Sequence, residues 1–309
     1  MDTNWREDEV IEAVIGAGSA SLAIGDDTAT IAPSSKSRVW CSDLVVDGVH
    51  VEVDRWPLAA IAHKAVAVNL SDLAAAGATP EATLLALACP PAIDARAIAV
   101  AVAEAADRLG APLVGGDTTR GATLTLCVTA LGQVDGTPLT RRGARSGDHL
   151  LVTGPLGAAS AGLRRVLAGE APEALPRHLH DALFAPQPRL AHGQLAASYG
   201  ASAAIDVSDG FSLDLHRLAD RSGVGFELDH VPIAPDATLA DALGGGEDYE
   251  LVIAIHDPSA LIDACRAAGL REPIVVGRIV ADARQRTLGG EPLAPRGWIH
   301  GASSPDITR

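Results

Sequence analysis

The sequence predicts an α/β fold of the mixed α+β kind, built as two successive α/β domains. Segments rich in β-formers alternate with long alanine-rich helical segments along the whole chain. A polar, arginine-rich stretch, DGTPLTRRGARSGD (135–148), interrupts this apolar pattern. The chain has 309 residues, which is long enough for two domains with separate cores. We therefore expect an N-terminal domain over 1–137 and a C-terminal domain over 138–309.

Five segments of the first half carry secondary-structure signals. RVWCSDLVV (38–46) predicts a strand, and the apolar pattern of 56–77 predicts a long helix. A buried strand is expected over 82–90, followed by a helix over 94–110 that a glycine ends. TLTLCVTALG (123–132) alternates apolar residues with threonines, which indicates a strand with one buried face.

The second half mixes further strands and helices, with an irregular linker and short helices expected over 168–189. The expected strands are HLLVTG, ASAAIDV, GFELD, YELVIAI and PIVVGRIV, and the expected helices are GAASAGLRRVLAG, FSLDLHRLADRSG and PSALIDACRAAG.

The composition excludes several classes of protein. Asp and Glu number 39 against 24 Lys and Arg, a net charge of −15, so the chain should repel nucleic acid and anionic membranes. The apolar run at 97–103 is too short to span a membrane, and the N-terminus has no signal-peptide pattern. Four cysteines lie far apart without a C-x-x-C pair, which fits a reducing cytoplasm.

The common nucleotide-binding motifs are missing. The chain has two lysines, Lys36 and Lys64, and neither follows a glycine, so a Walker A loop is excluded. No G-x-G-x-x-G motif and no H-R-D catalytic loop occur either. A nucleotide would have to be bound by another design.

Aspartates and glutamates recur at glycine-marked turns and strand ends. A single aspartate beside glycine is usually a turn residue or a helix cap, but six similar clusters favour a shared site. Several converging carboxylates repel one another and need cations, and hard oxygen ligands select Mg²⁺ or Ca²⁺. Mg²⁺ in proteins is commonly shared with substrate phosphates, to which Arg141 and Arg142 could add charge. The clusters are GDD (25–27), Asp43 with Asp47, Asn69 with Asp72, Asp117, Asp206 to Asp209, and Glu247 with Asp248.

The order of these motifs resembles the thiamine-monophosphate kinase family, within the superfamily of aminoimidazole ribonucleotide synthetase and selenophosphate synthetase. The resemblance runs from about residue 24 to PRGWIHG near the C-terminus. The motifs that carry it are IGDD, SDLVVDGVH, KAVAVNLSDLAAAGATP, GGDTTRG, LTRRGARSGD, LLVTGPLGAASAGL, AIDVSDGFSLDL and GGGEDYEL.

The resemblance implies ATP-dependent phosphorylation of thiamine phosphate to thiamine diphosphate, by direct transfer with several Mg²⁺ ions. It also implies a homodimer formed through the strands of the N-terminal domain, which binds ATP and metal. The C-terminal domain would complete the nucleotide and thiamine phosphate site.

Residue roles follow from the same resemblance. His50 is also a candidate general base, although a substrate-orienting role suits it better, and Asp214 is expected to be a surface helix residue. The positions that match metal ligands are Asp27, Ser42, Asp43, Asp72, Asp117, Asp206 and Asp209; those that match ATP contacts are Gly116, Asp117, Arg141 and Ser208; those that match thiamine phosphate contacts are His50, Glu247 and Trp298.

The chain departs from the family pattern at several positions. Cys41 stands where the family usually has serine, and Leu109 where it has a tyrosine near the adenine. Two alternatives to the kinase remain: another ATP-using enzyme of the superfamily, and a non-catalytic subunit that binds Mg²⁺-nucleotide. Turnover of ATP with thiamine phosphate would distinguish them.

Overall fold

Two units, each with its own β-sheet, make up the described part of the chain. The computed structural model describes residues 7–16 and 33–299. The first unit extends to Leu73 and continues from Ala78 to Thr137; the second comprises Ala74–Gly77 and the chain from Pro138 onward. Both units combine helices with a sheet, which confirms the mixed α/β class.

The sheet of the first unit has four strands in the order β1-β4-β2-β3. β4 runs antiparallel to β1 and to β2, whereas β2 and β3 are parallel. The bounds are β1 (Ser37–Val46), β2 (Thr79–Cys89), β3 (Leu113–Arg120) and β4 (Thr125–Val134).

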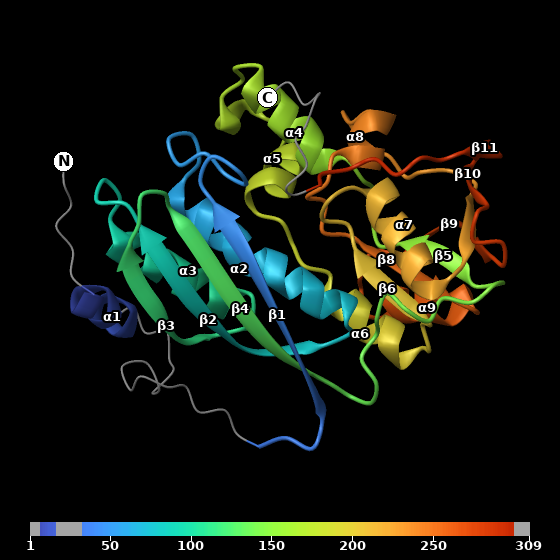
Figure 1. Ribbon diagram of the computed structural model, residues 1–309, viewed down its shortest axis with the longest axis horizontal. Helices are drawn as coiled ribbons and strands as arrows, with labels where there is room; N and C mark the ends of the chain where they lie inside the picture. The colour runs from blue at the N-terminus through green and yellow to red at the C-terminus, as the bar shows by residue number, and fades with distance from the viewer. Residues whose placement is uncertain (1–6, 17–32, 300–309) are drawn as a thin grey trace. The chain divides into compact units, whose positions relative to one another are not determined.

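Helices cover one face of this sheet. α2 (Leu58–Ala75) and α3 (Ala95–Arg108) lie behind the strands in Figure 1, and α1 (Glu7–Gly16) packs on α3. The alternate residues Leu126, Val128 and Ala130 of β4 are fully buried, as the alternation of the sequence predicts. α2 is long and apolar enough to cross a membrane by length and composition, but it is 72% buried here and is therefore the core helix of this unit.

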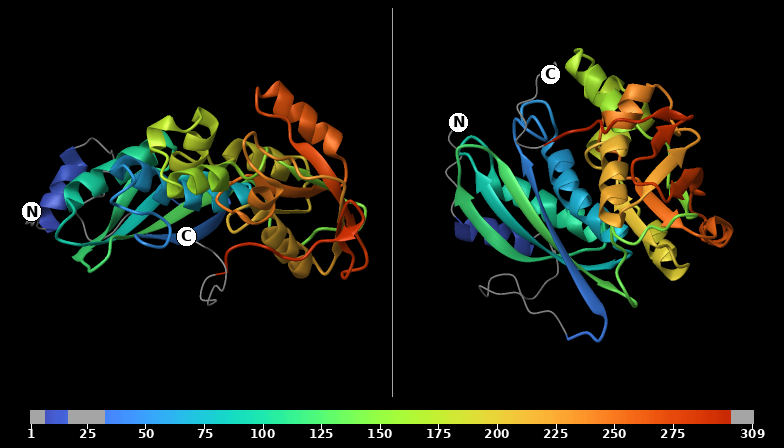
Figure 2. Two further views of the ribbon diagram at one scale, coloured as in Figure 1. Left: turned by 90° about the horizontal axis from the view of Figure 1, so that it is seen from above. Right: turned by 45° about the vertical axis from the view of Figure 1, so that its right-hand side comes forward.

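The opposite face, which we call the open face, has no helix of this unit among the described residues (Figures 1 and 2). Alternate residues of β1 point outward from it, and the side chains of Trp40 and Leu44 are 60% and 52% exposed. The strand register places Cys127 and Ala86 on the same face as Leu44. This face thus combines an exposed tryptophan and leucine with small residues.

The sheet of the second unit has seven strands in the order β11-β10-β7-β9-β5-β8-β6. All neighbouring strands are antiparallel except β7 and β10. The bounds are β5 (His149–Val152), β6 (Ala203–Asp206), β7 (Gly225–Leu228), β8 (Leu251–Ile255), β9 (Ile274–Val280), β10 (Arg286–Leu288) and β11 (Glu291–Pro292).

Two hydrophobic cores, one on each face, enclose this sheet. α7 (Phe211–Ser222) and α8 (Leu239–Gly244) contribute to one core, and α6 (Leu190–Ser198) and α9 (Pro258–Ala267) contribute to the other. The remaining helices are α4 (Ala158–Leu167), the 3-10 helix η1 (Pro172–Ala174) and α5 (Arg177–Phe184). The helices and strands expected from the sequence are present in the order expected.

The structure adds elements that sequence patterns did not indicate. GGDTTR (115–120) was expected only as a glycine-marked turn or a strand end, and it forms most of β3. β3 obtains its backbone hydrogen bonds from β2, and that pairing overrides the weak strand propensity of two glycines. Helix α6 was also missed, since its AHGQLAAS sequence lacks a clear apolar period.

Candidate functional site

Asn69 of helix α2 makes a hydrogen bond to strand β1 close to two of the predicted metal ligands, Asp43 and Asp72. Its side-chain oxygen accepts a hydrogen bond from the backbone N–H of Asp43 (3.0 Å), and its amide donates to the carbonyl of Ala65 (3.0 Å). Asn69 is fully buried, whereas Asp72 on the next turn is only partly buried. Because residues three apart share a helix face, the Asn69 contact draws Asp43 to the face of α2 that carries Asp72.

Ser42 does not share a face with Asp43. Its hydroxyl lies on the open face, 2.9 Å from the hydroxyl of Thr129 and 3.3 Å from the carbonyl of Val128. Successive strand residues point to opposite faces, so the Ser42 and Asp43 side chains diverge. The thiol of Cys41, on the side of Asp43, donates to the carbonyl of Asn69 (3.1 Å) and thus supports the contact between β1 and α2.

Asp117 lies at the other edge of the same sheet. The register pairs Asp117 with Ala86, which places its exposed side chain on the open face. Strands are spaced about 4.8 Å apart, so β3 and β1 are separated by about 14 Å across the sheet. Within one chain, Asp117 is therefore not beside Asp43. The preceding Gly116 is required, because a Cβ there would lie 1.8 Å from the carbonyl oxygen of Leu85.

His50 is held in one tautomer by the loop that follows β1. Its Nδ1 accepts the backbone N–H of Val46 (3.1 Å), so the neutral ring carries its proton on Nε2. Lys64 of α2, only 1% exposed, donates to the carbonyl of His50 (3.0 Å). The same ammonium lies 4.9 Å from the ring centroid of Trp56, a cation–π distance. Sequence reasoning missed this role of Lys64.

The turn between β6 and α7 carries the predicted residues of the second unit. Asp206 ends β6 and is 3% exposed, and residues 207–210 connect it to α7. Two backbone hydrogen bonds join this turn to the loop before β8: Val207 N–H donates to the carbonyl of Glu250 (2.8 Å), and Glu247 N–H donates to that of Ser208 (2.7 Å). The structure thus brings Asp206, Ser208 and Glu247 together.

Asp214 is not the surface helix residue that the sequence suggested. It is 1% exposed, because its side chain folds back from α7 to the turn. Its Oδ1 lies 2.6 Å from Nη1 of Arg217, and the same nitrogen lies 2.5 Å from Oδ2 of Asp209. Burial raises the pKa of the Asp214 carboxyl, although Arg217 acts to lower it. The expectation was wrong because it considered the helix without the turn before it.

A segment near the C-terminus packs against this turn. Trp298 N–H donates to the carbonyl of Asp209 (2.8 Å), and Leu213 N–H donates to the carbonyl of Arg296 (3.2 Å). A Cβ on Gly297 would lie 2.5 Å from the carbonyl oxygen of Asp209, so glycine permits the close approach. The structure therefore places the predicted substrate residue Trp298 directly beside Asp209.

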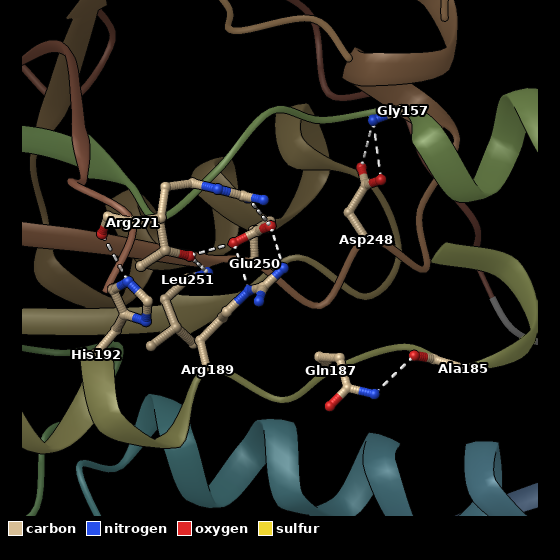
Figure 3. Close-up of polar contacts among 10 residues, drawn as sticks. Gly157, Ala185, Gln187, Arg189, His192, Asp248, Glu250, Leu251 and Arg271 are labelled. Carbon is tan, nitrogen blue, oxygen red and sulfur yellow. Dashed lines mark hydrogen bonds and ion pairs between the residues drawn. The ribbon is translucent and has the colours of Figure 1, made fainter. Parts of the chain in front are cut away.

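The glycine-rich loop before β8 has an unusual backbone. Glu247 and Tyr249 adopt positive φ angles of 60° and 49°, which cost about 1–2 kcal/mol each for residues other than glycine. Between them, the carboxylate of Asp248 accepts the N–H of Gly157 with both oxygens (2.9 and 2.8 Å; Figure 3). Asp248 thereby caps α4, and its burial raises its pKa to about 8 against the opposing effect of these N–H donors.

Glu250 anchors the base of this loop by an ion-pair cluster that sequence reasoning missed. Its carboxylate, 3% exposed, receives two hydrogen bonds from Arg189 (2.9 and 2.7 Å) and one from Arg271 (3.1 Å; Figure 3). Thr153 adds a further hydrogen bond (2.5 Å). Arg189, Arg271 and Thr153 lie 61, 21 and 97 residues from Glu250 in sequence, so no local sequence pattern predicts these contacts.

Arg141 lies at the far end of α7 from the turn. Its side chain is exposed, and its carbonyl accepts a hydrogen bond from Ser222, the last residue of that helix (2.9 Å). A helix of 12 residues is about 18 Å long, so the structure does not bring Arg141 beside Ser208. Its contact with ATP stays a prediction.

The donor chemistry fits Mg²⁺, although the described residues do not form a complete metal centre. In residues 7–16 and 33–299, no three His, Cys, Asp or Glu side chains are arranged to hold a metal ion. Asp27 lies outside the described residues. The predicted ligands are hard carboxylate oxygens, which suit Mg²⁺. In addition, a cation already contacts Asp209, namely the guanidinium of Arg217.

Comparison with known proteins first identifies the class of protein to which the two domains belong. Residues 25–134 match the AIR synthase related protein N-terminal domain, and residues 145–289 match the corresponding C-terminal domain. A thiamine-monophosphate kinase of Rhodopirellula baltica is 36% identical over 310 residues, covering 91% of this chain and 92% of that protein.

Solved structures show the same relationship. A thiamine-monophosphate kinase from Stenotrophomonas maltophilia K279a has a TM-score of 0.80 at 34% identity, covering 93% of this chain and 96% of that one. A structure described as AaThiL complexed with AMPPCP and TMP has a TM-score of 0.76 at 27% identity, covering 96% and 99%. The chain belongs to the thiamine-monophosphate kinase family.

Proposed function

We propose that this protein transfers the γ-phosphoryl group of ATP to thiamine phosphate, giving thiamine diphosphate and ADP. The observation that carries the proposal is the relationship to thiamine-monophosphate kinases over nearly the full length of both chains. The related structure in complex with AMPPCP and TMP supports a site for two phosphate-bearing substrates in one fold.

The residues of this chain suit a transfer that needs charge neutralisation more than a base. The acceptor is a phosphate monoester, which is largely ionised at neutral pH, so in-line placement is the main requirement. Mg²⁺, when bound, would neutralise the phosphates. Asp43 and Asp72 of the first unit, and Asp206 and Asp209 of the second, would each serve as ligands of such ions.

His50 would act as a hydrogen-bond donor rather than as a general base. Its Nδ1 is engaged with Val46, so its Nε2–H would donate to the substrate phosphate. Glu247 and Trp298 flank the turn that carries Ser208 and Asp209, which supports their assignment to thiamine phosphate and that of Ser208 to ATP. Gly116 would let the backbone of β3 approach the nucleotide.

The open face suggests a homodimer. Trp40 and Leu44 expose large apolar side chains beside Cys127 and Ala86, and a second copy of this face would bury them. The side chain of Asp117 points out of the same face, so in the dimer it would lie against the partner subunit.

The four cysteines, Cys41, Cys89, Cys127 and Cys265, are free thiols, which supports a cytoplasmic location. The net charge of −15 supports small-molecule substrates rather than nucleic acid or anionic membranes as partners.

Turnover of the purified protein tests the function. Incubation with MgATP and thiamine phosphate should yield thiamine diphosphate and ADP in equal amounts, measured by chromatography. Unphosphorylated thiamine is the matched control, and it should not be phosphorylated. ADP formation without thiamine diphosphate would instead favour another enzyme of the superfamily, and binding without turnover would favour a non-catalytic subunit.

A further inference from the structure

Asp214 organises the turn that carries Asp209. One of its oxygens, Oδ2, accepts hydrogen bonds from the backbone N–H groups of Ser208 (3.1 Å), Asp209 (3.0 Å) and Gly210 (3.1 Å). Three successive N–H groups that converge on one anion form a concave anion-binding turn. The anion here is the protein's own carboxylate, so the turn is fully formed without a ligand.

Arg217 is shared between two carboxylates. Its Nη1 contacts Asp209 Oδ2 (2.5 Å) and Asp214 Oδ1 (2.6 Å), and the guanidinium is about one third exposed, whereas Asp214 is buried. The Asp209 side chain is 19% exposed, so its carboxylate is accessible from one side. The positive charge beside Asp209 therefore occupies part of the coordination space of a metal ligand.

We propose that Arg217 is a resident counter-cation that competes with the divalent metal ion for Asp209, and that Asp214 retains Arg217 when the metal binds. The proposal rests on the proposed role of Asp209 as a metal ligand. A guanidinium in contact with a ligating carboxylate repels an incoming cation, so it weakens metal binding. Asp214 offers the guanidinium a second, buried partner, which lowers the cost of releasing Asp209.

This arrangement predicts opposite effects for two single substitutions. Arg217→Gln removes the competitor and should tighten divalent-metal binding by about three- to tenfold, a change that lies within the range of coupling between neighbouring residues. Asp214→Asn leaves Arg217 with Asp209 as its only full carboxylate partner among the described residues, and should weaken metal binding by a similar factor. A purely structural role would instead make both substitutions weaken binding.

The double variant separates charge from turn shape. If Asp214 acts through Arg217, then Asp214→Asn/Arg217→Gln should bind metal nearly as tightly as Arg217→Gln alone. If Asp214 serves only to shape the turn, the double variant should bind as weakly as Asp214→Asn. Asp220→Asn is the matched control, because Asp220 is an exposed aspartate on the same helix.

Two measurements test the proposal. The first titrates the protein with Mn²⁺ and follows free Mn²⁺ by electron paramagnetic resonance, which requires no turnover. The second varies free Mg²⁺ at fixed MgATP and thiamine phosphate, and the half-saturating concentration should shift in the same directions. Unchanged or weakened Mn²⁺ binding in folded Arg217→Gln overturns the proposal, whatever the substrate proves to be. Since Arg217 is partly exposed, this variant keeps the three Asp214 hydrogen bonds and should fold even if Asp214→Asn does not.

Discussion

At the residue scale, the side chains of the candidate site are defined by their hydrogen-bond partners. His50 is a donor because Val46 occupies its Nδ1, and Asp248 is a helix cap because Gly157 donates to both of its oxygens. Asp72 has a different character: it is partly exposed and stands one turn beyond the buried Asn69. Asp72 therefore differs from Asn69 in having part of its side chain in contact with solvent.

Asp72→Asn should therefore remove catalysis without unfolding the protein. The amide keeps the shape of the side chain but removes the negative charge that would bind a metal ion. We expect kcat to fall by at least about 10²-fold, the scale of one strong electrostatic contact in a site. Steady-state kinetics measures the loss, and circular dichroism should show unchanged folding. Near-normal activity at ordinary Mg²⁺ concentrations would show that Asp72 is only a helix-surface residue.

Trp298→Ala should weaken binding of thiamine phosphate selectively. Thiamine carries a cationic thiazolium ring, and an indole face attracts a cation by about 0.5–2 kcal/mol. The KM for thiamine phosphate should rise several-fold while the KM for ATP stays nearly constant. Leu239→Ala, at an exposed apolar residue of the same unit, is the control and should change neither value. Equal effects on both substrates would remove Trp298 from the thiamine site.

Local sequence motifs indicated the candidate site residues, but they could not predict the hydrogen bonds and ion pairs that surround them. Asp206, Ser208 and Asp209 were expected together because they share one strand-to-helix turn. Asp214 was misjudged, although an aspartate four residues into a helix can reach back to the orphan N–H groups at its start. Glu250 could not be assigned, because its arginine partners come from distant segments of the sequence.

At the scale of single elements, two helices of the second unit carry buried histidines. His192 of α6 is 5% exposed and contacts the carbonyl of Arg271 (2.9 Å); His216 of α7 is 6% exposed and contacts that of Ser212 (2.7 Å). Burial lowers the pKa of both imidazoles below the ordinary value of 6.5. Both helices are therefore packed around neutral rings.

These histidines should make the protein less stable in mild acid. Below the unfolded pKa of about 6.5, the unfolded chain binds protons that the folded chain does not, so stability falls as pH falls through that window. Each group adds at most about 1.4 kcal/mol per pH unit. Urea unfolding between about pH 5 and 7.5 measures the slope, which should be shallower in His192→Gln/His216→Gln.

At the scale of the whole molecule, the family relationship spans both units, yet the predicted ligands remain divided among separate elements. Asp43 and Asp117 occupy opposite edges and opposite faces of one sheet. The sequence indicated both residues, but it could not indicate this separation, because the position of β3 depends on its pairing with β2. The homodimer proposed above would place Asp117 at the interface between two copies of the chain.

Disruption of the open face should therefore abolish both dimerisation and activity. Trp40→Arg/Leu44→Arg places two positive charges on the open face. Both copies of a homodimer would carry these charges, so like charges would meet across the interface. Sedimentation velocity should give twice the monomer mass for the wild type and the monomer mass for the double variant. Tyr199→Arg, at an exposed aromatic residue at the end of α6, is the control and should remain dimeric and active. A folded double variant that is monomeric but fully active would show that Asp117 serves no partner subunit, and a monomeric wild type would show that the open face has another role.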